Sequence, residues 1–190
     1  MGQMLKNKSL QIFLKEIKSS SKVKSIGISL GSKNIIDNLD KLSQYEFIDY
    51  IQVPYSLDNP KLIYSINKWK EQYTGNLNLI GRSIFLHGLM CKNNPSLILD
   101  SNDHRSRKYS NELIEKVNIF KLEIKKKLDI SLRDAILLFS INNKHLKNVI
   151  IGATKEAHIQ DWKNIITGDK MNNDFSEKIL KISNNIFSKE

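Results

Sequence analysis

Short apolar runs alternate with helical patterns along most of this 190-residue chain, and this alternation constrains the fold more than any single motif. Four runs rich in β-branched residues predict strands, at residues 22–29, 47–55, 77–86 and 149–151. Strands that are separated by helices pair in parallel through right-handed crossovers. The alternation therefore predicts an α/β fold with a parallel sheet whose strands are buried on both faces.

Apolar residues spaced three and four apart predict helices between and after these strands. The stripes lie at residues 10–17, 35–42, 63–73, 113–124, 135–141, 156–166 and 175–186. Ser32 and Ser131 are placed as N-caps, and Pro60 stands at the start of a helix. Clusters of Asn, Ser, Asp and Pro predict a long surface loop over residues 91–108.

The chain length limits how much of a large fold can be present. A complete (β/α)8 barrel typically needs ~250 residues and rarely fewer than about 200. The composition, 40% hydrophobic and 26% charged, is that of a globular chain, which we interpret as one domain. No apolar run approaches the ~18 residues of a membrane span, and Met1–Lys6 lacks a hydrophobic signal core, so we expect a cytoplasmic protein.

The formal net charge of +10 raises nucleic acid as a partner, but the distribution of charge argues against it. The positive residues are mostly lysines scattered along amphipathic segments, and the run Lys125–Lys127 stands at the end of a helical pattern, where cations suit the helix dipole. A single cysteine, Cys91, excludes an internal disulfide and a cysteine-rich zinc site. A basic nucleic-acid binder remains as the least favoured reading.

Four segments, in this order, resemble the last four strand motifs of the aldo-keto reductases. They are K-V-K-S-I-G-I-S (22–29), I-D-Y-I-Q-V-P-Y (48–55), G-R-S-I-F-L-H-G-L (81–89) and V-I-I-G-A-T-K (149–155). The resemblance covers residues 8–166 and implies half of a (β/α)8 TIM barrel, with residues 167–190 as a C-terminal helix and 1–190 as a single domain. In that family, NADPH or NADH transfers hydride to an aldehyde or ketone.

The resemblance also implies which residues meet the cofactor. Ser29 and Gln52 would contact the nicotinamide carboxamide, and the loop from Ser83 to Gly88 would cradle the pyrophosphate. Arg82 stands where many members carry a Tyr that stacks on the nicotinamide ring, although some bacterial members also have Arg-Ser there. Gly152, Thr154, Lys155 and Asp161 would bind the adenosine part. The competing readings are a strand glutamine bonded to its neighbour for Gln52 and an ordinary turn for residues 83–88.

Three positions depart from the family pattern. Leu30 stands where Asn is usual, His158 where members that prefer NADP commonly have Arg, and Trp162 where Asn commonly meets the adenine. We therefore do not choose between NADP and NAD. The competing reading of Trp162 is a side chain that packs the last helix.

The family's proton-donating Tyr, with its Lys, Asp and His partners, precedes the fifth strand, where the resemblance begins. We therefore expect a truncated aldo-keto reductase-like oxidoreductase, inactive alone, with no catalytic residue in this chain. His87 is the best candidate for an active-site neighbour, although an ordinary turn histidine is the simpler reading.

Half a barrel exposes two unpaired sheet edges, so we expect a covering partner, either a second half-barrel chain or another copy of this one. The C-terminal helix is a further candidate cover. If the barrel is completed, the substrate would be a small carbonyl compound. The alternative function is a non-catalytic half-barrel that serves as a nucleotide-binding or oligomeric interaction module.

Overall fold

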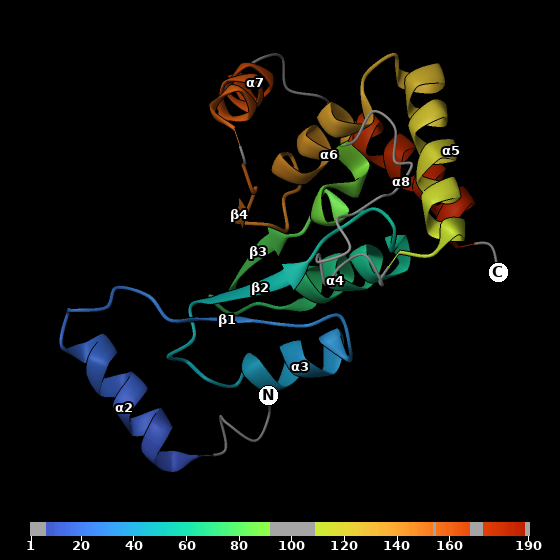
Figure 1. The fold of residues 1–190 in the computed structure, drawn as a ribbon. Coiled ribbons are helices and arrows are strands. Elements are labelled where there is room, and N and C mark those ends of the chain that lie inside the picture. Colours follow the sequence, from blue (N-terminus) through green and yellow to red (C-terminus); the bar gives the residue numbers. More distant parts are fainter. Residues whose placement is uncertain (1–6, 92–108, 154, 168–172, 189–190) are drawn as a thin grey trace. The chain divides into compact units, whose positions relative to one another are not determined.

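The computed structural model describes residues 7–91, 109–153, 155–167 and 173–188. Its strands alternate with helices in the predicted order (Figure 1). In chain order the elements are α2 (Lys8–Ser19), β1 (Gly27–Ser29), α3 (Ile35–Leu42), β2 (Tyr50–Pro54), α4 (Pro60–Gln72), β3 (Asn78–Arg82), the 3₁₀ turn η1 (Leu86–Cys91), α5 (Asn111–Leu128), α6 (Leu132–Ile141), β4 (Asn148–Val149), α7 (Glu156–Thr167) and α8 (Asn173–Phe187). The predicted loop falls mostly outside the described residues.

The four strands form one sheet in the order β1-β2-β3-β4, and every neighbouring pair is parallel. Ser29 pairs with Gln52 in the first ladder, and Pro54 pairs with Arg82 in the second. The parallel sheet predicted from the alternation is therefore confirmed.

The chain divides into two compact units. The first holds residues 1–54, 64–82 and 144–150, and therefore the whole sheet; the second holds residues 55–63, 83–143 and 151–190. In the first unit, right-handed crossovers place α3 and the later part of α4 on the same face of the sheet. Ile51, Val53 and Leu79 from the strands are fully buried together with Leu39 and Ile66 from these helices.

The sequence predicts strands that are buried on both faces of the sheet, and this prediction is wrong. In β2 and β3 buried residues alternate with half-buried ones, because successive strand side chains point to opposite faces. The half-buried set includes Tyr50, Gln52, Asn78 and Arg82, so this second face of the sheet is largely polar.

The second unit is built around three helices, α5, α6 and α8. Its core includes Phe120, Phe139 and Ile179, and Phe120 packs edge-on against Phe187 with ring centroids 5.5 Å apart. The buried Ser183 hydroxyl on α8 donates to the Leu57 carbonyl, which fixes the loop after β2 to this core. The structure places no helix in its described ranges that is both long and apolar enough to cross a lipid bilayer.

Several predicted boundaries shift for local reasons. Ser32 is not the cap of α3: the N-cap residue is Asn34, in the left-handed region at φ 50°, and no side chain caps the helix there. Strand β3 ends at Arg82 because Ser83 also has a positive φ of 57°, which breaks the extended backbone. Ser131 is confirmed as a cap, since its hydroxyl accepts from the Asp134 N–H at 3.1 Å.

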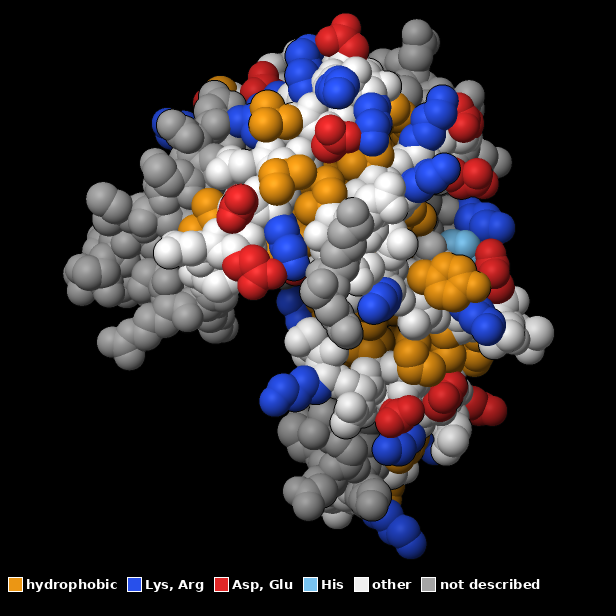
Figure 2. Space-filling model, turned by 90° about the vertical axis from the view of Figure 1, so that its right-hand side faces the viewer, with side chains coloured by type: hydrophobic (Ala, Val, Ile, Leu, Met, Phe, Trp, Pro, Cys, Tyr) orange, Lys and Arg blue, Asp and Glu red, His pale blue; other side chains and the backbone are white. Residues whose placement is uncertain are grey.

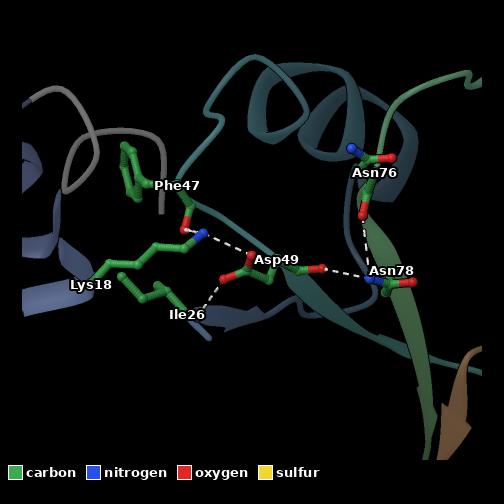
Figure 3. Close-up of polar contacts among 6 residues, drawn as sticks. All are labelled: Lys18, Ile26, Phe47, Asp49, Asn76 and Asn78. Atoms are coloured by element: carbon green, nitrogen blue, oxygen red, sulfur yellow. Dashed lines mark hydrogen bonds and ion pairs between the residues drawn. The ribbon is translucent and has the colours of Figure 1, made fainter. Parts of the chain in front are cut away.

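A polar network at the amino end of the sheet attaches α2 to the strands of the first unit (Figure 3). The Asp49 carboxylate accepts from Lys18 Nζ at 2.7 Å and from the Ile26 N–H at 2.8 Å, while Lys18 also donates to the Phe47 carbonyl. The Asp49 carbonyl accepts from the Asn78 N–H at 2.9 Å. Asp49 therefore links α2, the segment before β1, and β3.

Candidate functional site

Ser29 and Gln52 lie side by side at the carboxyl ends of β1 and β2. Because they are register partners in a parallel ladder, both side chains belong to the polar face of the sheet. Ser29 is exposed and Gln52 is half-buried. Within the described ranges, neither the Ser29 hydroxyl nor the Gln52 amide has a hydrogen-bond partner, so both retain donor and acceptor capacity for a ligand.

Arg82 extends over the same end of the sheet from β3. Its Nη2 donates to the carbonyl oxygen of Leu30, two strands away, at 2.5 Å. The side chain therefore crosses the carboxyl end of β2, beside the Ser29 and Gln52 pair. This contact places one positive charge next to two neutral polar groups.

Leu30 takes part in this arrangement through its backbone. Its side chain is only 1% exposed, so it belongs to the core and offers nothing to a ligand. Its N–H donates to the Gln52 carbonyl at 2.8 Å, and its own carbonyl holds Arg82. The position that departs from the family pattern therefore serves to place Gln52 and Arg82.

The loop expected to cradle a pyrophosphate belongs to the second unit. Leu86, His87 and Gly88 all have positive φ, as does Ser83, so this turn is held in a conformation that side chains rarely adopt. A Cβ added at Gly88 would meet nothing within 4 Å, which means that its φ of 91°, not a close approach, requires glycine. The N–H groups of Leu86, Gly88 and Met90 donate to backbone carbonyls of the loop itself.

The predicted adenosine-binding residues also lie in the second unit. Gly152 and Lys155 are exposed just before α7, and Thr154 falls outside the described residues. Asp161 on α7 is exposed but engaged, since its carboxylate accepts from Arg133 on α6 at 3.1 Å. This ion pair connects α7 to α6, which is a structural role that the sequence did not indicate.

Trp162 is half-buried, and its ring stacks on Phe85 with centroids 6.3 Å apart and planes inclined by 23°. His158, one turn earlier on α7, lies against the same indole, with ring centroids 6.1 Å apart. The Trp162 Nε1–H is buried and finds no acceptor within the part of the chain that is described. The two departures from the family pattern on α7 thus form an aromatic cluster with Phe85.

His87 has an electrostatic neighbour that the sequence reasoning missed. Burial raises the pKa of Asp58; local hydrogen bonds and, as the smallest contribution, the charge interaction with His87 offset only part of that increase. Asp58 lies in the segment between β2 and α4, so the signal available in the sequence was a carboxylate shortly after a strand end.

A pocket of about 280 Å³ in the second unit lies among Met90, Cys91, Lys121 and the first residues of α6. Burial raises the pKa of the Cys91 thiol to about 11, so this group stays protonated near neutral pH. The described ranges contain no cluster of His, Cys, Asp and Glu that could hold a metal ion. None of the predicted site residues lines this pocket.

Lysines and arginines on the surface are interspersed with carboxylates on the face drawn in Figure 2. Several are paired along helices: Lys116 with Glu112 at 2.7 Å, and Lys127 with Glu123 at 2.6 Å. The run of lysines near residue 126 occupies the last turn of α5, as predicted. On this face, mixed and paired charge of this kind is typical of solvated helix surfaces.

Comparison with known proteins places the fold. No protein-family model and no curated protein matches the sequence. Among solved structures, the chain matches a glycerol dehydrogenase from Gluconobacter oxydans with a TM-score of 0.70 and 17% identity, over 93% of this chain and 54% of that one. It also matches an aldo-keto reductase from Bacillus halodurans in the apo form (TM-score 0.62, 14% identity, 89% and 54% covered) and the holo form (0.63, 15%, 89% and 53%).

These matches confirm the predicted fold class. The parallel sheet and its helices correspond to part of the barrel of the aldo-keto reductases, as the strand motifs implied. The chain spans about half the length of the solved structures that it matches.

Proposed function

We propose that this chain is the cofactor-side half of an aldo-keto reductase-like oxidoreductase, which binds NADPH or NADH and reduces a small carbonyl compound once the barrel is complete. One observation carries the proposal: Ser29, Gln52 and Arg82 gather at the carboxyl ends of three adjacent parallel strands. In parallel α/β sheets and barrels, this end is where ligands bind.

The chemistry of this trio fits a nicotinamide carboxamide. That group has one carbonyl acceptor and one NH₂ donor, and it is held in a fixed plane only if both are engaged. The Gln52 amide and the Ser29 hydroxyl offer both kinds of partner and make no other hydrogen bonds in the described ranges. When bound, the cofactor would supply the hydride; the role of these side chains would be to orient it.

Arg82 would contribute charge and position. Anchored on the Leu30 carbonyl, its guanidinium holds a positive charge at this end of the sheet, and its plane offers a surface against which a ring could lie. Because the guanidinium is held at one end, less side-chain freedom would be lost on binding.

The adenosine end has weaker support. Asp161 pairs with Arg133, and Trp162 packs between Phe85 and His158, so an aromatic cluster stands where polar contacts were expected. Of the residues predicted to bind the adenosine part, Lys155 still presents an exposed positive charge just before α7. The proposal therefore does not distinguish NADP from NAD.

No proton donor is assigned within this chain. General acid catalysis contributes roughly 10² to 10⁴ in rate, so carbonyl reduction requires the barrel half that carries the donor. We propose that the chain binds cofactor without turning over a carbonyl substrate until that half is supplied.

The test is a titration of the purified chain with NADPH and with NADH, followed by fluorescence and calorimetry, beside Ser29→Ala and Gln52→Ala. The matched control is Gln72→Ala. Gln72 is an exposed glutamine at the carboxyl end of α4, the helix that follows β2. We expect saturable binding that Gln52→Ala weakens about tenfold, since one or two hydrogen bonds are worth about 1.4 kcal/mol. No saturable binding, or equal effects of Gln52→Ala and Gln72→Ala, would overturn the proposal.

A further inference from the structure

The turn Phe85–Gly88 combines a left-handed backbone with side chains that disfavour it. Its first and last residues are joined by a 3.0 Å hydrogen bond from the Gly88 N–H to the Phe85 carbonyl. The two central residues, Leu86 and His87, have φ values of 50° and 52°, as in a type I′ turn. Gly, Asn and Asp dominate these central positions, because a Cβ makes the left-handed conformation unfavourable. Contacts outside the turn must therefore hold Leu86 and His87 in it.

The hydrogen bond within the turn does not explain this conformation. The mirror-image type I turn makes the same bond between its first and fourth residues with negative φ at both central positions. The buried side chains of Phe85 and Leu89 fix the two ends of the turn to the core of the second unit, but they do not act on its central peptide. A contact that distinguishes the two forms must act on that peptide, which joins Leu86 to His87.

The Tyr109 hydroxyl makes such a contact. It donates at 3.1 Å to the Leu86 carbonyl, which belongs to the central peptide of the turn and lies 23 residues away in the sequence. Mirror-image turns direct this carbonyl to opposite sides, so a donor held on one side favours one form. The position of Tyr109 is itself fixed, because the next residue, Ser110, caps α5 by accepting from the Leu113 N–H.

We propose that Tyr109 is a positioning residue: its hydroxyl selects the left-handed form of the turn Phe85–Gly88, and this form is the one that accepts the pyrophosphate of NADPH or NADH. The inference rests on the proposed function, because the resemblance to the aldo-keto reductases implies that the pyrophosphate lies at residues 83–88. In the left-handed form, a Cβ added at Gly88 would meet no atom of the described residues within 4 Å. An anion can therefore approach the backbone there.

The experiment compares the parent chain with Tyr109→Phe, which removes the hydroxyl and keeps the ring. Tyr64→Phe is the matched control, because Tyr64 is 67% exposed on α4. NMR of the chain without cofactor measures the turn at Leu86 and His87, since the nuclear Overhauser effect between a residue's own amide and α protons is strong at positive φ and weak at negative φ. Titrations with NADPH, NADH and inorganic pyrophosphate, followed at the Gly88 amide, then measure affinity.

We expect Tyr109→Phe to shift the ratio of left-handed to right-handed turn about fivefold toward the right-handed form, as the loss of one neutral hydrogen bond implies. Affinity for all three ligands should fall by the same factor as the left-handed fraction, because only that fraction binds. Adding His87→Gly, which removes the Cβ at φ 52°, should restore the left-handed signal of Leu86 in Tyr109→Phe. Tyr64→Phe should change neither the signal nor the affinities.

Three results would overturn the inference. The first is an unchanged signal at Leu86 and His87 in Tyr109→Phe. The second is a parent that does not bind inorganic pyrophosphate, or an affinity that stays the same although the signal changes. The third is a signal that His87→Gly does not restore, which would mean that the lost hydroxyl acts through general destabilisation. Failure of the proposed function is distinct, because it appears as absent NADPH and NADH binding in a parent whose turn still binds inorganic pyrophosphate.

Discussion

Asp49 should contribute more to stability than its ion-pair partner Lys18, although they share one short contact (Figure 3). The two side chains are 27% and 28% exposed, so their ion pair belongs to the range of about 0.2 to 1 kcal/mol. Asp49 also accepts from the partly buried Ile26 N–H at 2.8 Å. Removing the carboxylate leaves this donor unsatisfied, at a cost of roughly 1 to 3 kcal/mol.

Asp49→Ala should therefore lower the free energy of unfolding by about 2 to 3 kcal/mol, and Lys18→Met by about 1 kcal/mol or less. Urea unfolding followed by circular dichroism gives both values, and the double variant gives the coupling, expected near 0.5 to 1 kcal/mol. Exposed Lys8 on the same helix provides the control Lys8→Met, expected within 0.5 kcal/mol of the parent. Hydrogen exchange at Ile26 should accelerate in Asp49→Ala and not in Lys18→Met.

A Lys18→Met variant that loses as much stability as Asp49→Ala would refute this reasoning, because it would mean that the ion pair and not the bond to Ile26 fixes the strand. Zero coupling in the double variant would show that the 2.7 Å contact does not contribute.

The remaining predictions concern pH, one thiol and two backbone positions. Burial alone would raise the pKa of Asp49, but the hydrogen bonds from Lys18 and Ile26 outweigh it and hold this pKa below its usual value near 3.8. The stabilisation that Asp49 contributes is therefore present above pH 3.8 and is lost as the pH falls further. The free energy of unfolding of Asp49→Ala should lack this acid-dependent loss. Burial and two lysines outweigh Glu71 and lower the pKa of His145 below 6.5. The free energy of unfolding should therefore decrease as the pH drops below 6.5. Urea midpoints measured from pH 7.5 to 5 should depend less on pH in His145→Gln than in the parent. Cys91, with a pKa of about 11, should react with iodoacetamide at pH 8 roughly 100-fold more slowly in the folded chain than in urea, as followed by mass spectrometry; equal rates would contradict its burial. Gly88→Ala should destabilise the second unit by about 1 to 2 kcal/mol because of its φ of 91°, whereas His87→Gly, at φ 52°, should be neutral or stabilising; thermal unfolding that ranks them in the opposite order would exclude a conformational cause.

The order of the elements could be predicted because it depends on local patterns. Runs of β-branched residues located all four strands, and Pro60 and Ser131 marked helix starts that the structure confirms. Pro54 ends β2, where its missing N–H disturbs the ladder least. These signals act within a few residues of the positions that they specify.

The parts that were mispredicted depend on contacts between distant segments. The strand expected from residue 22 begins at Gly27 in the structure, and the N–H just before it, that of Ile26, binds the side chain of Asp49, 23 residues away. Similarly, no local pattern shows that Arg82 reaches the carbonyl of Leu30, a separation of 52 residues. The sequence named Ser29, Gln52 and Arg82 through a family resemblance, and only the sheet register shows why they are neighbours.

The predicted adenosine-binding residues were harder to interpret from the sequence, for a different reason. Asp161 was considered only as a ligand-binding position, whereas Trp162 was also considered as a side chain that packs the last helix. An exposed carboxylate and a large ring both serve to attach a helix. Here Asp161 pairs with Arg133 and Trp162 stacks on Phe85, so α7 is attached through the same side chains. Sequence alone does not separate these two uses.

The most direct test of the account is residue-resolved hydrogen exchange of the chain with and without saturating NADPH or NADH. The account predicts slower exchange at the carboxyl ends of the strands, at residues 29–30, 52–53 and 82, with no change at the amino-end network of Ile26 and Asn78. Unchanged exchange at the carboxyl ends, or protection confined to the amino ends, would contradict the claim that Ser29, Gln52 and Arg82 form a cofactor site.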